Sequence, residues 1–114
     1  MMRSPAELAQ AQLEAYNAKD LDAFCACYGQ NVQVFEPPAP LPTLQGLAAL
    51  RARYAGAAFA NPELQAEVLQ RIVCGPTVVD HERVHVPGQP DRDLVVVYRC
   101  EDGHIASVFF YKSP

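Results

Sequence analysis

The densest run of ionisable side chains lies at positions 79–85, inside a segment that we expect to be a strand. Because a strand has a period of two, Asp80 and Glu82 share one face, while His81, Arg83 and His85 share the other. If the first face lines a protein interior, repulsion between the two carboxylates raises the pKa of at least one of them. That carboxylate would then be suited to proton transfer near neutral pH. The alternative is a strand at a subunit interface, where the same charges form surface ion pairs.

A third candidate carboxylate, Glu36, ends a short alternating segment at 32–36 and directly precedes a run with four prolines in six residues. Prolines at this density exclude helix and central strand, so we expect a stiff loop over one end of the domain. In an apolar pocket, Glu36 would have a raised pKa and could shuttle protons. The alternative is a solvated acid at a strand end.

The sequence predicts neither a metal site nor a cofactor. His81 and His85 share a face, but no third ligand accompanies them. There is no glycine-rich phosphate loop. The cysteines form no Cys-x-x-Cys pair, so we expect buried free thiols, with two disulfides in an oxidising compartment as the alternative. They are Cys25, Cys27, Cys74 and Cys100.

The composition predicts one domain spanning 1–114, since 114 residues is a typical domain length and half of them are hydrophobic. The formal net charge of −4 argues against nucleic-acid or anionic-membrane partners, because both require a basic face. No apolar signal core follows the N-terminus, and no run approaches the length of a membrane span. We therefore expect a cytoplasmic protein.

The pattern predicts helices first and a sheet afterwards, which is the α+β class. Ser4 and Glu7 form a capping box around Pro5, and Asp20 can cap a second helix that ends near 29–31. A third helix covers about 47–59. From position 64 the period changes to two, with short turns between the segments, so we expect an antiparallel meander. Its four strands are 64–74, 77–86, 92–100 and 104–112.

Four segments together resemble the nuclear-transport-factor-2-like superfamily, which includes ketosteroid isomerases and SnoaL-like polyketide cyclases. They read AYNAKDLDAF at 15–24, YGQNVQVFEP at 28–37, an apolar helix after Gln45-Gly46, and EDGHI at 101–105. The resemblance implies a cone-shaped α+β, cystatin-like fold, with three N-terminal helices packed in a strongly curved antiparallel sheet. It also implies an apolar pocket at the open end and a homodimer formed through the outer face of the sheet.

The resemblance assigns the position of the isomerase general base to Glu36. The isomerase also has a tyrosine and a protonated aspartic acid that stabilise the enolate. Their positions fall on Gln12 and near Val96. Gln12 can donate a hydrogen bond and Val96 cannot, so classical ketosteroid isomerase activity is not expected.

Matching the meander to the isomerase pattern turns the Asp80 and Glu82 face into the cone, although a shift of one residue would reverse this assignment. Arg51 or Tyr54 could then pair with these carboxylates. The expected pocket residues are Gln12, Tyr16, Arg51, Tyr54, Asp80, Glu82, Val96 and Tyr98.

These residues favour a pocket protein that binds a small apolar or polycyclic molecule. With Glu36 as base, it would perform proton-transfer, isomerisation or cyclisation chemistry. The alternative is a non-catalytic ligand-binding or dimeric scaffold domain, which the valine in place of the acidic donor favours.

Overall fold

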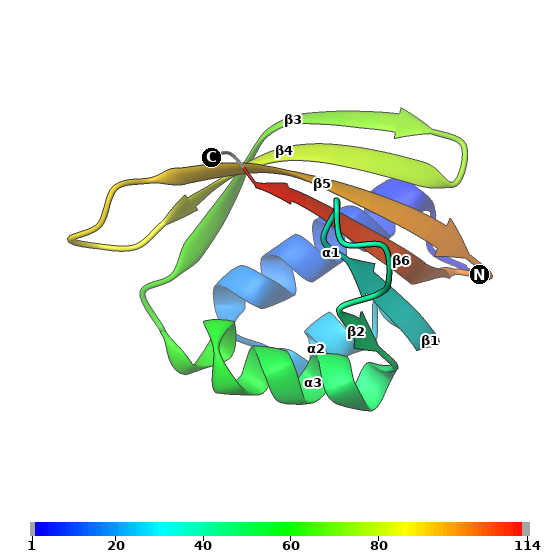
Figure 1. Ribbon diagram of the computed structural model, residues 1–114, viewed down its shortest axis with the longest axis horizontal. Coiled ribbons are helices and arrows are strands. Elements are labelled where there is room, and N and C mark those ends of the chain that lie inside the picture. Colours follow the sequence, from blue (N-terminus) through cyan, green and yellow to red (C-terminus); the bar gives the residue numbers. More distant parts are fainter. Residues whose placement is uncertain (1, 113–114) are drawn as a thin grey trace.

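Three helices and a short 3-10 turn lie against one face of a six-stranded sheet that curves around them (Figure 1). The computed structural model describes residues 2–112. The helical elements are α1 (Pro5–Ala18), α2 (Leu21–Cys25), α3 (Leu47–Gly56) and η1 (Ala58–Ala60). The strands are β1 (Tyr28–Phe35), β2 (Leu44–Gln45), β3 (Gln65–Cys74), β4 (Thr77–His85), β5 (Arg92–Glu101) and β6 (His104–Lys112).

The start of α1 is the capping box predicted from the sequence. The Ser4 hydroxyl accepts a hydrogen bond from the Glu7 amide, and the Glu7 carboxylate accepts one from the Ser4 amide. The helix ends at Lys19, which adopts the left-handed conformation. Asp20 then caps α2 by accepting a hydrogen bond from the Ala23 amide. These local contacts fix where α1 begins and ends and where α2 begins.

The second helix is shorter than predicted, because the expected helix end at 29–31 is part of β1. Tyr28 pairs with Ile105 of β6, so ladder hydrogen bonds replace another helical turn. Tyr28 is buried as it would have been on a helix, and for that reason the apolar spacing did not separate the two conformations. The two-residue strand β2 was not predicted, and α3 ends at Gly56, before the expected boundary.

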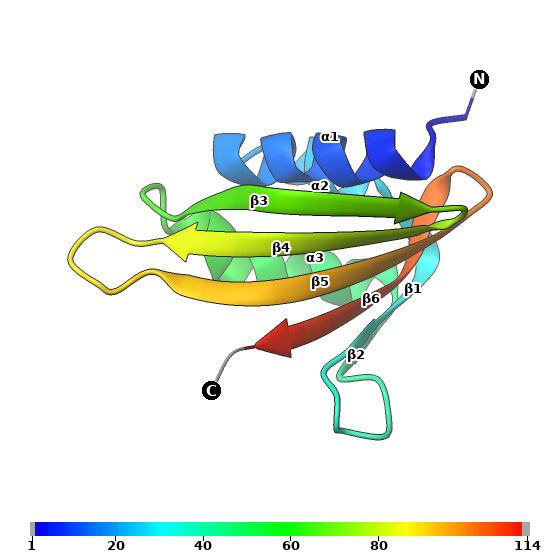
Figure 2. The same cartoon turned by 90° about the horizontal axis from the view of Figure 1, so that it is seen from above.

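The sheet has the strand order β2-β1-β6-β5-β4-β3, and its last four strands form the predicted antiparallel meander (Figure 2). The β1–β6 pair is parallel, so the sheet is mixed rather than wholly antiparallel. The α+β class with N-terminal helices is confirmed. On β4, the side chains of Val78, Asp80 and Glu82 are buried beneath the helices, as the family pattern indicated.

The core between the helices and the sheet is centred on the ring of Phe24, which is 1% exposed. Its centroid lies 4.7 Å from that of Tyr54, 4.9 Å from that of Tyr28 and 5.2 Å from that of Phe59. This one ring therefore joins α2 to α3, η1 and β1. Within the described residues, no helix has the length and apolar character needed to cross a bilayer.

Replacing Phe24 should lower stability strongly. Phe24→Ala should reduce the free energy of unfolding by about 3–5 kcal/mol, because it removes a buried aromatic ring and leaves a cavity. Urea unfolding followed by circular dichroism measures this loss. Leu41→Ala is the control, since Leu41 is 73% exposed and its truncation should change stability by less than about 0.5 kcal/mol. Equal effects of the two substitutions would contradict the central role of Phe24.

Candidate functional site

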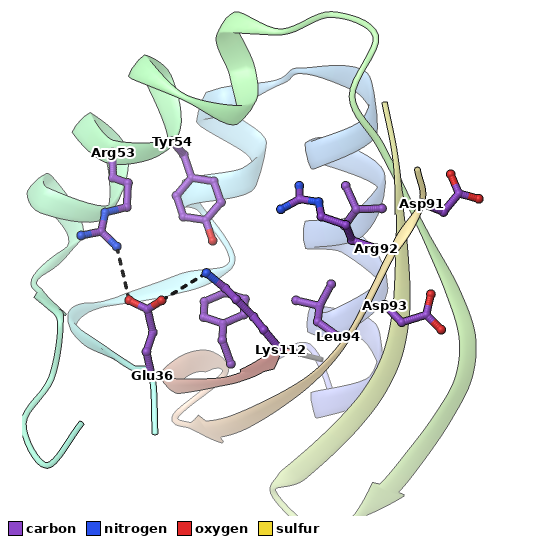
Figure 3. A pocket seen from close by; sticks show the side chains of 10 residues that line it. Glu36, Arg53, Tyr54, Asp91, Arg92, Asp93, Leu94 and Lys112 are labelled. Carbon is purple, nitrogen blue, oxygen red and sulfur yellow. Dashed lines mark hydrogen bonds and ion pairs between the residues drawn. The ribbon is translucent and has the colours of Figure 1, made fainter. Parts of the chain in front are cut away.

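A cavity of about 820 Å³ opens between α3, the ends of β1 and β6, and the start of β5 (Figure 3). A smaller compartment of about 90 Å³ lies deeper under the sheet and shares Tyr54, Val84, Leu94 and Phe110 with the outer one. We call these two spaces the outer and the inner compartment. The outer compartment is also lined by Glu36, Arg53, Asp91, Arg92, Asp93 and Lys112. The inner compartment is also lined by Gln12, Leu13, Tyr16, Phe24, Tyr28, Ala66, Glu82 and Tyr98.

Glu82 is the acidic group of the inner compartment and is 7% exposed. Burial, and after it the negative charge of Asp80, raises the pKa of the Glu82 carboxyl to about 7. The hydrogen bond donated by Tyr98, at 3.2 Å, opposes this rise. Glu82 can therefore exchange its proton near neutral pH.

A chain of buried hydrogen bonds holds Glu82 in place. The Tyr28 hydroxyl donates to Gln12 Oε1 at 3.2 Å, and Gln12 Nε2 donates to the Tyr98 hydroxyl at 2.9 Å. Tyr98 in turn donates to Glu82. Gln12 Nε2 also donates to the Ala9 carbonyl, so both of its amide hydrogens are engaged. Gln12 therefore fixes Tyr98 and has no hydrogen left for the ligand bond that the sequence predicted for it.

Tyr16 and Tyr54 also line the inner compartment, but their hydroxyls are not part of this hydrogen-bond chain. Within residues 2–112, neither hydroxyl has a hydrogen-bond partner. Burial raises the pKa of Tyr16 to about 12 and that of Tyr54 well above its ordinary value, with Glu82 adding to both. Both hydroxyls therefore stay protonated at neutral pH and are available as donors to a bound molecule.

Glu36 lies at the mouth of the outer compartment (Figure 3). Its carboxylate is 3.4 Å from Lys112 Nζ and 4.0 Å from Arg53 Nη1. Hydrogen bonding with Thr43, followed by the charge of Lys112, lowers the pKa of Glu36. The expected rise was wrong, because this side chain is 34% exposed and two cations compensate its charge.

Asp80 shares the inner face with Glu82 but lines neither compartment. Its carboxylate is fully buried, and Arg71 binds it with two hydrogen bonds of 2.7 and 3.0 Å. The expected group of Glu36, Asp80 and Glu82 is therefore divided among three environments. Asp80 acts on the inner compartment through its charge, which raises the pKa of Glu82.

Two further sequence-predicted residues lie outside the cavity. Arg51 forms an ion pair with the exposed Asp22, because its place on α3 turns it toward α2. Val96 is fully buried in the core between the strands and α1, and lines neither compartment. Both were wrong as pocket residues.

Three cations at the mouth, Arg53, Arg92 and Lys112, were not predicted from the sequence. Two of them could have been predicted, because the strand period of two places Arg92 and Lys112 on the inner face. Arg92 has the same parity as Tyr98 on β5, and Lys112 pairs with the inward-facing Leu94. Arg53 could not be found in this way, because its place at the mouth depends on how α3 lies across the sheet.

Among the residues that the structure describes, no cluster of three or more His, Cys, Asp or Glu side chains could hold a metal ion. The four cysteines are free. Cys25, Cys27 and Cys100 are buried, as expected for inert thiols. Cys74 is exposed, because it ends β3 at the turn into β4.

The sequence pattern of the SnoaL-like domain family matches residues 9–108, which is most of the chain. The chain belongs to this family. The predicted relationship to the nuclear-transport-factor-2-like superfamily is therefore confirmed, and so is the cystatin-like fold. No curated protein matches the sequence.

Three solved structures illustrate what this SnoaL-like domain is similar to. An uncharacterised cystatin-fold protein of Novosphingobium aromaticivorans is 26% identical, with a TM-score of 0.83, and the match covers 96% of this chain and 99% of that one. A candidate ketosteroid isomerase of Kribbella flavida is 18% identical, with a TM-score of 0.84 and coverages of 99% and 80%. A computationally designed 17-OHP binder is 16% identical, with a TM-score of 0.83 and coverages of 97% and 92%. The last two share the fold alone.

The raised pKa of Glu82 predicts a pH-dependent stability. The folded chain binds this proton more tightly than the unfolded chain, whose glutamates have a pKa near 4.5. The stability due to protonated Glu82 is therefore complete at low pH and is lost as the pH rises through about 7. Glu82→Gln removes this dependence. Between pH 4.5 and pH 8, the free energy of unfolding of Glu82→Gln minus that of the parent chain should therefore increase by up to about 3 kcal/mol.

Urea unfolding at a series of pH values measures this difference. Glu63→Gln is the control, because Glu63 is exposed and its replacement should leave the pH profile of the parent chain unchanged. A constant offset between Glu82→Gln and the parent across this pH range would contradict the raised pKa.

Proposed function

We propose that this SnoaL-like domain binds a small, mostly apolar carbonyl compound and transfers a proton at carbon, as in an isomerisation or cyclisation. The observation that carries the proposal is Glu82, a buried carboxyl with a pKa of about 7. It lines the same compartment as Tyr16 and Tyr54, whose hydroxyls have no hydrogen-bond partner within residues 2–112. Glu82, rather than Glu36, is the proposed base.

The chemistry follows from the groups in the inner compartment. Removing a proton next to a carbonyl places negative charge on the carbonyl oxygen, and donors aimed at that oxygen lower the barrier. The Tyr16 and Tyr54 hydroxyls can supply these hydrogen bonds. They would take the role of the two isomerase donors, whose positions in this sequence fall on Gln12 and near Val96. The abstracted proton would remain on Glu82 until it returns to a different carbon of the same molecule.

The dimensions of the cavity support a small ligand. Cavities for drug-sized molecules have volumes of roughly 300–1,000 Å³, and the outer compartment lies within this range. Val84, Leu94, Phe110 and the Tyr54 ring provide apolar walls. Such walls suit the ring system of a ligand whose carbonyl group enters the inner compartment.

Proton transfer at carbon can be measured without the natural substrate. Incubation in D₂O with the cyclic ketone 2-tetralone should exchange the hydrogens beside the carbonyl faster than buffer alone, as followed by NMR. Glu82→Gln should lower this rate at least about 100-fold, the usual contribution of a general base. The parent rate should rise with pH through about 7, because only ionised Glu82 accepts a proton.

Two other substitutions complete this experiment. Glu63→Gln changes an exposed glutamate on the chain segment before β3 and should keep the parent rate. Glu36→Gln tests the base first predicted from the sequence. A loss with Glu36→Gln and not with Glu82→Gln would contradict the choice of base. Exchange no faster than buffer would contradict proton transfer on this class of ketone.

A second candidate function is non-catalytic ligand binding. It is favoured by the small inner compartment, whose volume of about 90 Å³ is far below the roughly 300–1,000 Å³ of cavities for drug-sized molecules. In that case Glu82 and the tyrosines would contact only a protruding oxygen of the ligand. Binding of 2-tetralone measured by calorimetry, without deuterium exchange, would select this function.

We also propose that the chain forms a homodimer through the outer face of the sheet. This face carries an apolar band that includes Ile72, Val79, Val95 and Tyr111, of which Ile72 is 62% exposed and Tyr111 46% exposed. Exposed apolar patches of this kind are typical of protein interfaces. Three ionisable residues of β4 share this face and have acidic partners. His81 and Arg83 contact Asp93, and His85 contacts Glu67 and Asp91.

A single charge in this band should separate the dimer. Val95→Asp, at the centre of the face, should convert the protein to monomers in light-scattering measurements at micromolar concentration, because a buried unpaired carboxylate is costly. Val73→Asp is the matched control, since Val73 is also exposed but pairs with the inward-facing Val78. A parent chain that is already monomeric, or a Val95→Asp dimer, would contradict this interface.

A further inference from the structure

The charged residues at the mouth of the outer compartment do not all face it (Figure 3). By composition, the lining has three acids and three bases. However, the side chains of Asp91 and Asp93 point away from the cavity, toward the outer side of the sheet. Asp91 lies 3.0 Å from His85 Nδ1, and Asp93 accepts a hydrogen bond of 2.8 Å from Arg83 Nε.

The strand period explains this separation. Arg92 pairs with Val84 and has the same parity as Leu94, so it faces the helices. Its two sequence neighbours, Asp91 and Asp93, have the opposite parity. The cavity mouth therefore presents three cations, Arg53, Arg92 and Lys112, and one carboxylate, Glu36, although the chain has a net charge of −4.

Arg92 differs from the other two cations. Arg53 and Lys112 both lie beside Glu36. Within residues 2–112, no carboxylate forms an ion pair with Arg92. Its guanidinium points across the opening toward Tyr54 (Figure 3). Its positive charge also reaches the inner compartment, where it lowers the pKa of Tyr16 against the larger effect of burial.

We propose that Arg92 binds a carboxylate on the ligand, so that the natural ligand is an apolar carboxylic acid held at the mouth by its anionic end. This inference rests on the proposed function and names its ligand class. The planar guanidinium presents paired N–H donors that match the two oxygens of a carboxylate. Asp91 and Asp93 cannot compete for it, because they lie on the other side of the strand.

The strand register sets the distance between Glu82 and Arg92, and therefore the length of a ligand that contacts both. Glu82 pairs with Leu94, and the next inward-facing pair along the same two strands is Val84 with Arg92. The base and the cation are therefore diagonal neighbours, which lie about 7–8 Å apart in a sheet, with their Cβ atoms somewhat closer. A molecule that reaches both would carry its carboxylate about one or two rings away from its reacting carbon. Val84 and Leu94 would contact the rings between them.

Two probes that share one ring system, one with an anionic and one with a neutral substituent, test this inference. The naphthalene ring of 2-naphthoate and of 2-naphthamide is the same, and only the first has a carboxylate. Calorimetry at low salt should find that the parent chain binds naphthoate about five- to tenfold more tightly, a preference reduced from that of a buried pair by the open, solvated mouth. About 0.5 M NaCl should reduce this preference.

The variants separate a specific contact from a general attraction. Arg92→Gln should abolish the preference for naphthoate, and Arg92→Lys should keep only part of it, since an ammonium lacks the planar pair of donors. Arg99→Gln is the matched control, because Arg99 is an exposed arginine of the same strand with outward parity. It should keep the full preference.

Three results would overturn the inference. They are equal affinities of the two probes for the parent chain, a preference that survives Arg92→Gln, and an equal loss in Arg99→Gln. If both probes bind equally, the cavity remains a small-molecule site and only the carboxylate inference fails. If neither binds, the cavity does not take molecules of this class. Deuterium exchange of the neutral ketone tests the proton-transfer function separately, because 2-tetralone has no anionic group.

Discussion

The burial of two carboxyl groups on one strand is the constraint on which the site depends. Asp80 and Glu82 lie on the inner face of β4, among valines and tyrosines where an unpaired charge is unfavourable. The two carboxyl groups have different hydrogen-bond donors. Asp80 remains compensated by two hydrogen bonds from Arg71, which belongs to the adjacent strand β3. Glu82 accepts a hydrogen bond from the neutral donor Tyr98, and burial together with the charge of Asp80 raises its pKa to about 7.

The hydrogen-bond chain through Tyr28, Gln12 and Tyr98 gives this raised pKa a defined geometry. It connects β1, α1 and β5 to Glu82 on β4, so the position of the carboxyl depends on how the helices pack against the sheet. Because Gln12 and Tyr98 are engaged with each other, the donors that remain for a ligand are on Tyr16 and Tyr54. Glu36, by contrast, is ion-paired at the mouth and keeps its charge near neutral pH.

The two sides of the sheet have different charges although their residues alternate along the same strands. On the outer side, Asp91, directly before β5, contacts His85, and Asp93 on β5 contacts Arg83 and His81. Arg92, between them in sequence, faces the cavity. An acidic chain can therefore present a positive opening to a ligand, because the strand period sorts its charges by face rather than by neighbourhood in the sequence.

The sequence by itself determined the fold class, the capping of α1 and α2, the four meander strands and the shared face of Asp80 and Glu82. These features follow from local patterns: capping residues, turn residues and a period of two. The inward direction of that face was expected from the family resemblance alone, and the structure decided it. The start of β1 was not predicted, because the apolar Tyr28 fits a helical and a strand pattern equally well. Only the tertiary structure decided that Glu82 has the raised pKa, because this depends first on its burial and then on the charged groups around it. Arg71 of β3 pairs with Asp80 and Lys112 of β6 pairs with Glu36, whereas no cation among residues 2–112 forms an ion pair with Glu82. Distances between strands and helices, rather than positions along the chain, set these pairings.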